Sequence, residues 1–151
     1  MFSCTARCSI ALTTFALACL AIGSPAQISA IRFDGVYQAS VQPPPGWQVK
    51  PTEQLFLYFR FYPDGSVVSV LSTATPMRVA TFLRRHIELS GNGNYSISGD
   101  RVQLRVTARQ GDIDYWGGIG RDSLQLSSQN HASHNHVTVR QYKFVSVHFS
   151  K

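Results

Sequence analysis

Cysteine is nearly absent from this sequence, and its distribution excludes a disulfide framework. The chain has three cysteines, Cys4, Cys8 and Cys19, and all three precede residue 20. A domain formed by the residues that follow has no thiol to pair, so its hydrophobic core must hold it together. The remaining chain, about 120 residues, is long enough to bury such a core.

Acidic residues are scarce as well. The chain has 14 Lys and Arg against 8 Asp and Glu, an excess that favours anionic surfaces in a non-specific way. The basic residues are scattered and form no run, so we expect no nucleic-acid partner. The recurrence of Arg101, Arg105 and Arg109 is typical of the solvated face of a strand.

Several catalytic motifs are missing. The sequence has no glycine-rich phosphate loop and no Gly-x-Ser-x-Gly nucleophile elbow. Four acids, Asp64, Asp100, Asp112 and Asp122, lie in segments that contain glycine, where aspartate stabilises turns. No arrangement of a nucleophile and a base is visible, so we expect neither an enzyme nor a cofactor.

The first 26 residues have the features of an export signal. Arg7 supplies a short positive region, residues 10–22 are apolar and uncharged, and residues 24–26 supply small side chains at a cleavage site. The apolar run is shorter than the about 20 residues of a membrane helix. We therefore expect a secreted or periplasmic protein without a transmembrane segment once the leader is removed. A second processing route would lipidate Cys19 and leave the protein anchored to a membrane.

The stretch from Leu55 to Leu71 predicts a β-hairpin. Its aromatic and β-branched residues favour strands, and Pro63-Asp64-Gly65 has the composition of a tight turn. A three-residue loop would pair Phe61 with Val67 and Phe59 with Ser69. The expected faces are Leu55, Leu57, Phe59, Phe61, Val67 and Leu71 on one side, and Phe56, Tyr58, Arg60, Tyr62, Val68 and Val70 on the other.

Further strands are predicted on both sides of the hairpin. Turn signals recur every eight to twelve residues, a spacing typical of an all-β sandwich or barrel. The clearest alternation lies in residues 101–109, where apolar side chains at even positions are expected to face inward. The other strands are expected at residues 33–41, 93–98, 113–119, 123–128 and 136–147.

One helix interrupts this series. Thr75 is a suitable N-cap and Pro76 a good first helical residue, and the helix is expected to reach about His86. Its expected apolar face consists of Val79, Phe82, Leu83 and Ile87. The sequence thus predicts an all-β domain at residues 33–151, preceded by a disordered lead at 27–32. The expected architecture is one eight-stranded antiparallel meander barrel with a short helix near residues 76–86.

Two segments resemble known families. Gly35-Val36-Tyr37, at the start of the first strand, resembles the Gly-x-Trp signature of lipocalins, with Tyr in place of Trp. This resemblance implies a lipocalin-like (calycin) barrel, and it gives Arg140 the role of the family's arginine, which packs over that aromatic residue. The region from Asp34 to Leu83 is similar to the β-rich C-terminal domain of a group of F-box proteins and to small exported bacterial proteins of unknown function. The second resemblance implies the barrel fold alone, because the sequence shows no F-box and has an export signal, so the ubiquitin-ligase role of those proteins is not carried over.

The predicted barrel and its aromatic hairpin favour a binding function. We expect the barrel to bind a small apolar or amphipathic ligand. The residues expected to line its binding site are Leu57, Phe59, Phe61, Tyr115 and Trp47. Trp47 lies on a proline-rich loop, and we expect it to plug the mouth of the barrel, with a lid over a cavity as the alternative. A second hypothesis is a structural or interaction protein whose barrel is filled by these side chains and whose loops contact an envelope protein.

Histidine is concentrated in one segment. His131, His134 and His136 could converge on a transition metal if the loop folds back. Their spacing matches no established zinc pattern, and a hydrophilic loop rich in turn formers explains the same composition. We therefore assign no metal site and keep these residues as weak candidates.

Overall fold

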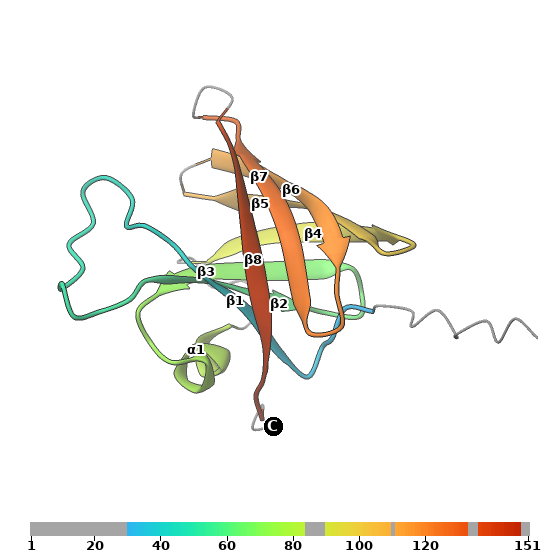
Figure 1. Cartoon of the computed structure of the whole chain (residues 1–151), viewed down its shortest axis with the longest axis horizontal. Coiled ribbons are helices and arrows are strands. Elements are labelled where there is room, and N and C mark those ends of the chain that lie inside the picture. Colours follow the sequence, from blue (N-terminus) through green and yellow to red (C-terminus); the bar gives the residue numbers. More distant parts are fainter. Residues whose placement is uncertain (1–29, 84–89, 110, 133–135, 149–151) are drawn as a thin grey trace, which may run out of the picture.

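The computed structural model describes residues 30–83, 90–109, 111–132 and 136–148. These residues form eight strands and one helix in the described ranges (Figure 1). The elements are β1 (Gly35–Ser40), β2 (Phe56–Phe61), β3 (Ser66–Ser72), α1 (Pro76–Phe82), β4 (Gly91–Ser98), β5 (Arg101–Ala108), β6 (Gly111–Ile119), β7 (Ser123–Asn130) and β8 (Val137–Ser146).

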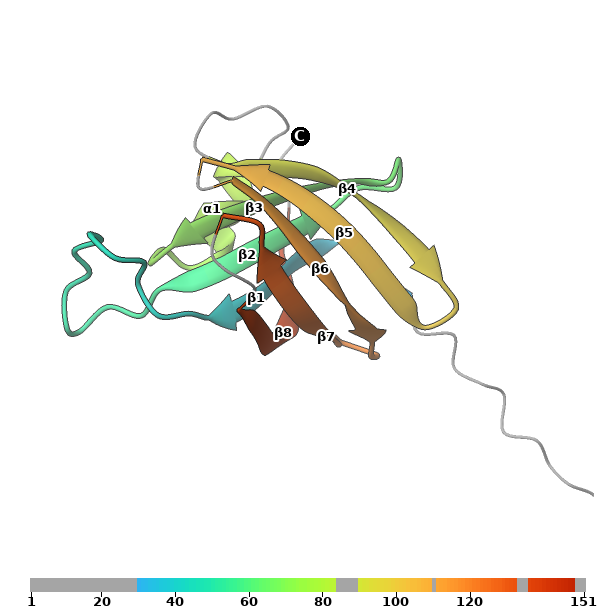
Figure 2. The ribbon, with the colours of Figure 1, turned by 90° about the horizontal axis from the view of Figure 1, so that it is seen from above.

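The eight strands close into one antiparallel barrel in the order of the sequence. Each strand pairs with the next, and β1 also pairs with β8, where Tyr37 lies opposite Phe144. Figures 1 and 2 show the meander from two directions. Closure leaves no free sheet edge. The predicted fold class is therefore confirmed, including the single short helix among the described residues.

The hairpin has the predicted register. Phe61 lies opposite Val67 and Phe59 opposite Ser69. Gly65 adopts a φ of 86°, a left-handed conformation that glycine tolerates without steric cost. Asp64 accepts hydrogen bonds from the backbone N–H of Ser66 at 3.1 Å and from its hydroxyl at 2.7 Å. The turn residues thus act as their side-chain chemistry predicts.

Both faces of the hairpin are buried, each in a different core. The inward face joins the barrel interior, which includes Phe59, Phe61 and Val67. The outward face, which includes Tyr58 and Val68, forms a second cluster with the buried residues of α1. The helix covers the outside of the barrel, and this cover explains why the hairpin has an apolar residue on nearly every position.

The apolar face of α1 lacks one of the residues expected on it. Val79, Ala80 and Leu83 are buried, but Phe82 is 64% exposed, so its expected place on the apolar face is wrong. Thr75 is the N-cap residue, yet its side chain makes no capping hydrogen bond. The backbone carbonyl of Leu83 accepts hydrogen bonds from the Tyr62 hydroxyl and the Arg60 guanidinium, both at 2.9 Å. The predicted remainder of the helix, with His86 and Ile87, lies outside the described residues.

One end of the barrel is tied together by Arg32. Its guanidinium donates to Asp34 at 2.7 Å and to Asp122 at 2.8 Å, and it stacks over the Phe144 ring at 4.0 Å. Its backbone N–H donates to the Tyr37 hydroxyl at 3.0 Å. A disordered lead was expected at residues 27–32. That expectation is wrong for Ile31, which is buried, and for Arg32.

Candidate ligand-binding site at the barrel mouth

The opposite end of the barrel, here called the mouth, is where β1, β3, β5 and β7 end and where the strands that follow them begin. The long β1–β2 loop extends from this end, at the left of Figure 2. A pocket of about 170 Å³ opens there. It is lined by Trp47, Leu57, Ser69, Val70, Leu71, Ser90, Gly91, Ala108, Arg109, Ile113 and Tyr115.

Three of the five predicted lining residues meet at this pocket. Leu57 comes from β2, Tyr115 from β6 and Trp47 from the β1–β2 loop. Trp47 is 46% exposed, so it does not plug the barrel as expected but stands at the rim of the pocket. Phe59 and Phe61 are fully buried in the interior core and do not line the pocket.

Aromatic rings form the floor beneath the mouth. The ring centroid of Phe59 lies 5.1 Å from that of Tyr115 and 5.1 Å from that of Tyr142. Phe61 continues the stack toward Tyr37, with centroids 5.6 Å apart. These side chains fill the middle of the barrel, as eight-stranded barrels allow. The pocket at the mouth therefore ends above these rings.

A chain of polar side chains lies on the inner face of β7 and β8 at the same end. The hydroxyls of Ser128 and Thr138 are 2.8 Å apart, and the Arg140 guanidinium donates to the Thr138 hydroxyl at 2.8 Å. Ser128 is buried, and Thr138 and Arg140 are half-buried. Ser128 also lies directly opposite Tyr115 in the β6–β7 ladder. The polar chain and the pocket therefore share a border at Tyr115.

The positive charge of Arg140 affects the hydroxyls of Tyr115 and Tyr142. Burial raises the pKa of Tyr115 to about 12, and the positive charge of Arg140 opposes this rise. Burial also raises the pKa of Tyr142, with a smaller contribution from Tyr115, and Arg140 again acts in the opposite direction. Both hydroxyls remain neutral donors at physiological pH.

The position of Arg140 corrects one expectation from the lipocalin resemblance. Arg140 was expected to pack over Tyr37. It lies instead toward the mouth, and Arg32 is the arginine that stacks on Phe144, whose ring contacts that of Tyr37, at the other end. The motif-based assignment of Arg140 is therefore wrong.

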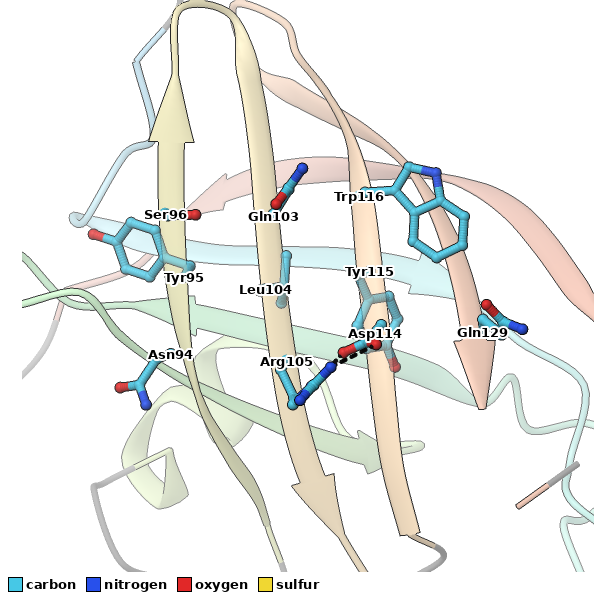
Figure 3. Close-up of a pocket in the computed structure, with 10 residues that line it drawn as sticks. All are labelled: Asn94, Tyr95, Ser96, Gln103, Leu104, Arg105, Asp114, Tyr115, Trp116 and Gln129. Carbon is cyan, nitrogen blue, oxygen red and sulfur yellow. Dashed lines mark hydrogen bonds and ion pairs between the residues drawn. The ribbon is translucent and has the colours of Figure 1, made fainter. Parts of the chain in front are cut away.

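His131 and His136, the described residues of the expected histidine cluster, do not line the mouth pocket. The His131 Nε2 atom is 2.7 Å from Asp114, whose carboxylate also accepts two hydrogen bonds from Arg105 at 2.6 and 3.0 Å (Figure 3). Arg105, followed by His131, lowers the pKa of Asp114 to about 2. His136 is exposed, and His134 lies outside the described residues. Across the ranges given above, no three His, Cys, Asp or Glu side chains are placed to hold a metal ion.

The outer surface of β4 to β7 carries a shallower depression. It has a volume of about 520 Å³, and Trp116, Gln103, Gln129 and the Arg105–Asp114 pair face it (Figure 3). Leu104 and Tyr115 alternate with these residues and point into the barrel core. This surface is open and polar, whereas the mouth pocket is more enclosed and has mainly apolar walls. The mouth is therefore the stronger candidate site.

Comparisons with protein-family models, with curated proteins and with solved structures give no match. The closed antiparallel barrel of eight strands has the general shape of a lipocalin-like fold. In the part of the chain that the structure describes, no helix is long and apolar enough to cross a membrane.

Proposed function

We propose that this protein is an exported, lipocalin-like barrel that binds a small apolar or amphipathic ligand at its mouth. The observation that carries the proposal is the meeting of Trp47, Leu57 and Tyr115 around one pocket. Apolar walls with a few polar groups are typical of small-molecule sites. The proposed export rests on the leader sequence, and the proposed kinship with calycins rests on Gly35-Val36-Tyr37 and the shape of the barrel.

The pocket volume limits the ligand. About 170 Å³ is below the ~300 Å³ at the small end of drug-sized sites and holds about six water-sized volumes of ~30 Å³. A whole long-chain lipid does not fit, since Phe59 and Phe61 fill the space beneath. The ligand would insert a short apolar end and keep the rest near Trp47 at the rim.

A fluorescent fatty-acid probe tests this proposal. We expect saturable binding that unlabelled short-chain amphiphiles displace, because the pocket accepts one apolar end at a time. The two tryptophans of the chain allow a matched control. Trp47→Ala is expected to weaken binding, and Trp116→Ala, which removes the same side chain from the outer face of β6, is expected to leave it unchanged. Absence of saturable binding to the wild-type protein would contradict the proposal.

A second candidate function follows from the filled interior. A barrel packed with Phe59, Phe61 and Tyr142 needs no ligand to be stable, and its exposed Trp47 is then available to an envelope protein. In that case a partner captured by the wild-type protein is lost with Trp47→Ala and retained with Trp116→Ala, while the lipid probe does not bind.

A further inference from the structure

The outer face of strands β4 to β8 has a regular arrangement of polar side chains. The strand registers align outward-facing residues in rows that cross all five strands. One row consists of Ser96, Gln103, Trp116, Ser127 and Val139. Amide side chains lie in the rows on both sides of it, with Asn94 and Gln129 in one and Gln125 in the other. Trp116 therefore lies at the centre of a surface rich in amide and hydroxyl groups, here called the outer polar face.

The fold buries Trp116 only in part. It is 37% exposed, whereas the outward face of the hairpin is covered by α1. Its neighbour on β7 is the short Ser127, and the next outward residue of β6 is Gly118, where an added Cβ would meet no atom within 4 Å beyond its chain neighbours. Figure 3 shows the indole extending from β6 toward Gln129. Among the described residues the indole N–H donates to no protein group, so the ring and its donor can both contact a ligand.

Two depressions of the outer polar face meet at Trp116. The one described above has a volume of about 520 Å³, and a second, of about 550 Å³, has Gly118, Gln125 and Ser127 in its lining. Trp116 and Gln103 line both depressions. Each volume lies within the range of small-molecule sites, about 300–1,000 Å³. A linear ligand that crosses Trp116 can therefore occupy both.

The charges that line these depressions are mostly paired. Arg105 donates two hydrogen bonds to Asp114, at 2.6 and 3.0 Å, and Arg101 is the remaining charged residue in the two linings. Single-stranded nucleic acid binds where a positively charged groove runs beside aromatic side chains, and the pairing of Arg105 with Asp114 removes such a groove here. The other side-chain polar groups of the linings are chiefly uncharged amides and hydroxyls. The outer polar face therefore suits an uncharged ligand with many hydrogen-bonding groups.

We infer that the outer polar face is a second binding site, for a neutral oligosaccharide whose sugar rings stack on Trp116. The indole offers a flat apolar surface to the C–H groups of a sugar ring, beside one N–H donor. A glutamine amide has two N–H donors and an acceptor oxygen, a set that pairs with hydroxyl groups. The amides of Gln103 and Gln125 form no hydrogen bond with other side chains or backbone in the described ranges, so they can bind sugar hydroxyls. This site is separate from the mouth pocket, and the inference does not depend on the ligand proposed there.

Three neutral hexasaccharides that differ in sugar or linkage test the inference: maltohexaose, cellohexaose and chitohexaose. Binding is followed in a Trp47→Phe variant, which leaves Trp116 as the single tryptophan. We expect at least one hexasaccharide to bind saturably and to protect the emission of Trp116 from quenching by acrylamide. Hexathymidylate, which combines stacking bases with a charged backbone, is expected to bind more weakly than that hexasaccharide. The hexasaccharide that binds most tightly identifies the class of glycan.

Aromatic variants then locate the site. Trp116→Ala is expected to weaken binding of the preferred hexasaccharide at least about tenfold in calorimetric titration, and Trp116→Phe, which keeps a ring, is expected to weaken it less. Phe82→Ala removes an aromatic side chain that is 64% exposed on α1, away from this face, and is expected to keep the affinity. Equal losses in Trp116→Ala and Phe82→Ala would overturn the assignment of Trp116.

The failure of this inference is distinguishable from that of the proposed function. If none of the three hexasaccharides binds, or if hexathymidylate binds more tightly than all of them, the inference is overturned, and binding of the fatty-acid probe at the mouth is unaffected. The protection of Trp116 from quenching decides whether the sugar lies on this ring even if Trp116→Ala does not fold, which the unfolding midpoint of that variant would show.

Discussion

Phe59→Ala should be among the most damaging single substitutions in the barrel. Phe59 is fully buried, and its ring contacts the rings of Phe61, Tyr115 and Tyr142 at centroid distances of 6.2, 5.1 and 5.1 Å. Truncation of a buried phenylalanine typically costs about 3–5 kcal/mol. Each aromatic contact adds roughly 0.5–1.5 kcal/mol beyond the buried area, so the upper part of that range is expected.

This cost is large compared with the stability of such a domain. A single domain usually has about 5–15 kcal/mol in total, and no disulfide is available to the residues after Cys19. For about 120 residues, each kcal/mol lowers the melting temperature by roughly 3–5 °C. We therefore expect Phe59→Ala to lower the melting temperature by roughly 10–25 °C in thermal unfolding. In urea, the midpoint of unfolding should fall, while the dependence of the unfolding free energy on urea concentration stays the same.

The matched control is Phe82→Ala on the exposed side of α1. Phe82 is 64% exposed, and alanine is the best helix former, so its removal should change stability by no more than about 0.5 kcal/mol. Both variants lose the same side chain, Phe59→Ala from a buried position in β2 and Phe82→Ala from an exposed position in α1. An equal loss of stability in the two variants, or a Phe59→Ala protein that melts like the wild type, would refute the assignment of the barrel interior.

Three further predictions concern the turn and the titratable groups. Asp64→Ala removes both hydrogen bonds to Ser66 and should cost about 0.5–1.5 kcal/mol in urea unfolding, and no measurable loss would contradict the role of this side chain in the turn. Asp114 has its pKa lowered from 3.8 to about 2 by Arg105 and His131, so its contribution to stability is present above pH 3.8 and is lost as the pH falls toward 2. NMR titration of the Asp114 carboxyl should show this midpoint, and Arg105→Gln should move it upward. Burial raises the pKa of Tyr115 from 10.0 to about 12. The contribution of the neutral Tyr115 side chain to stability is therefore fully present below pH 10 and is lost as the pH rises toward 12. Tyr115→Phe should reduce this alkaline loss of stability, measured by unfolding at a series of pH values.

The fold was predictable wherever the alternation of side chains agreed with burial. In β5 the inward positions Val102, Leu104 and Val106 are all apolar and all buried, so the period of two fixes the register. The hairpin was predictable for another reason, because Pro63-Asp64-Gly65 sets the loop length and thereby the pairing. In both segments, local sequence and global packing favour the same structure.

The start of β8 shows why the candidate site was only partly predictable. Val137 and Val139 are 46% and 61% exposed, while Thr138 and Arg140 face the interior. The hydrophobic pattern thus favours the wrong face at this end of the strand. Tyr142, which is buried further along β8, and the pairing with β1 and β7 decide the register instead. Trp47, Leu57 and Tyr115 could be named from composition, but the polar inner face formed by Ser128, Thr138 and Arg140 depends on the long-range pairing of β7 with β8.

The two ends of the barrel each carry an arginine, and the two side chains differ in their partners. Arg32 lies at the surface, pairs with Asp34 and Asp122, and stacks on Phe144. Its hydrogen bond to Asp34 lowers the pKa of that carboxyl, so this end is satisfied by the chain's own acids. Arg140 lies on the inner surface, and its described hydrogen bond goes to a neutral hydroxyl, that of Thr138. The two arginines therefore stabilise the barrel by different means: Arg32 through ion pairs and a ring contact at the surface, and Arg140 through a hydrogen bond within the inner face of β8.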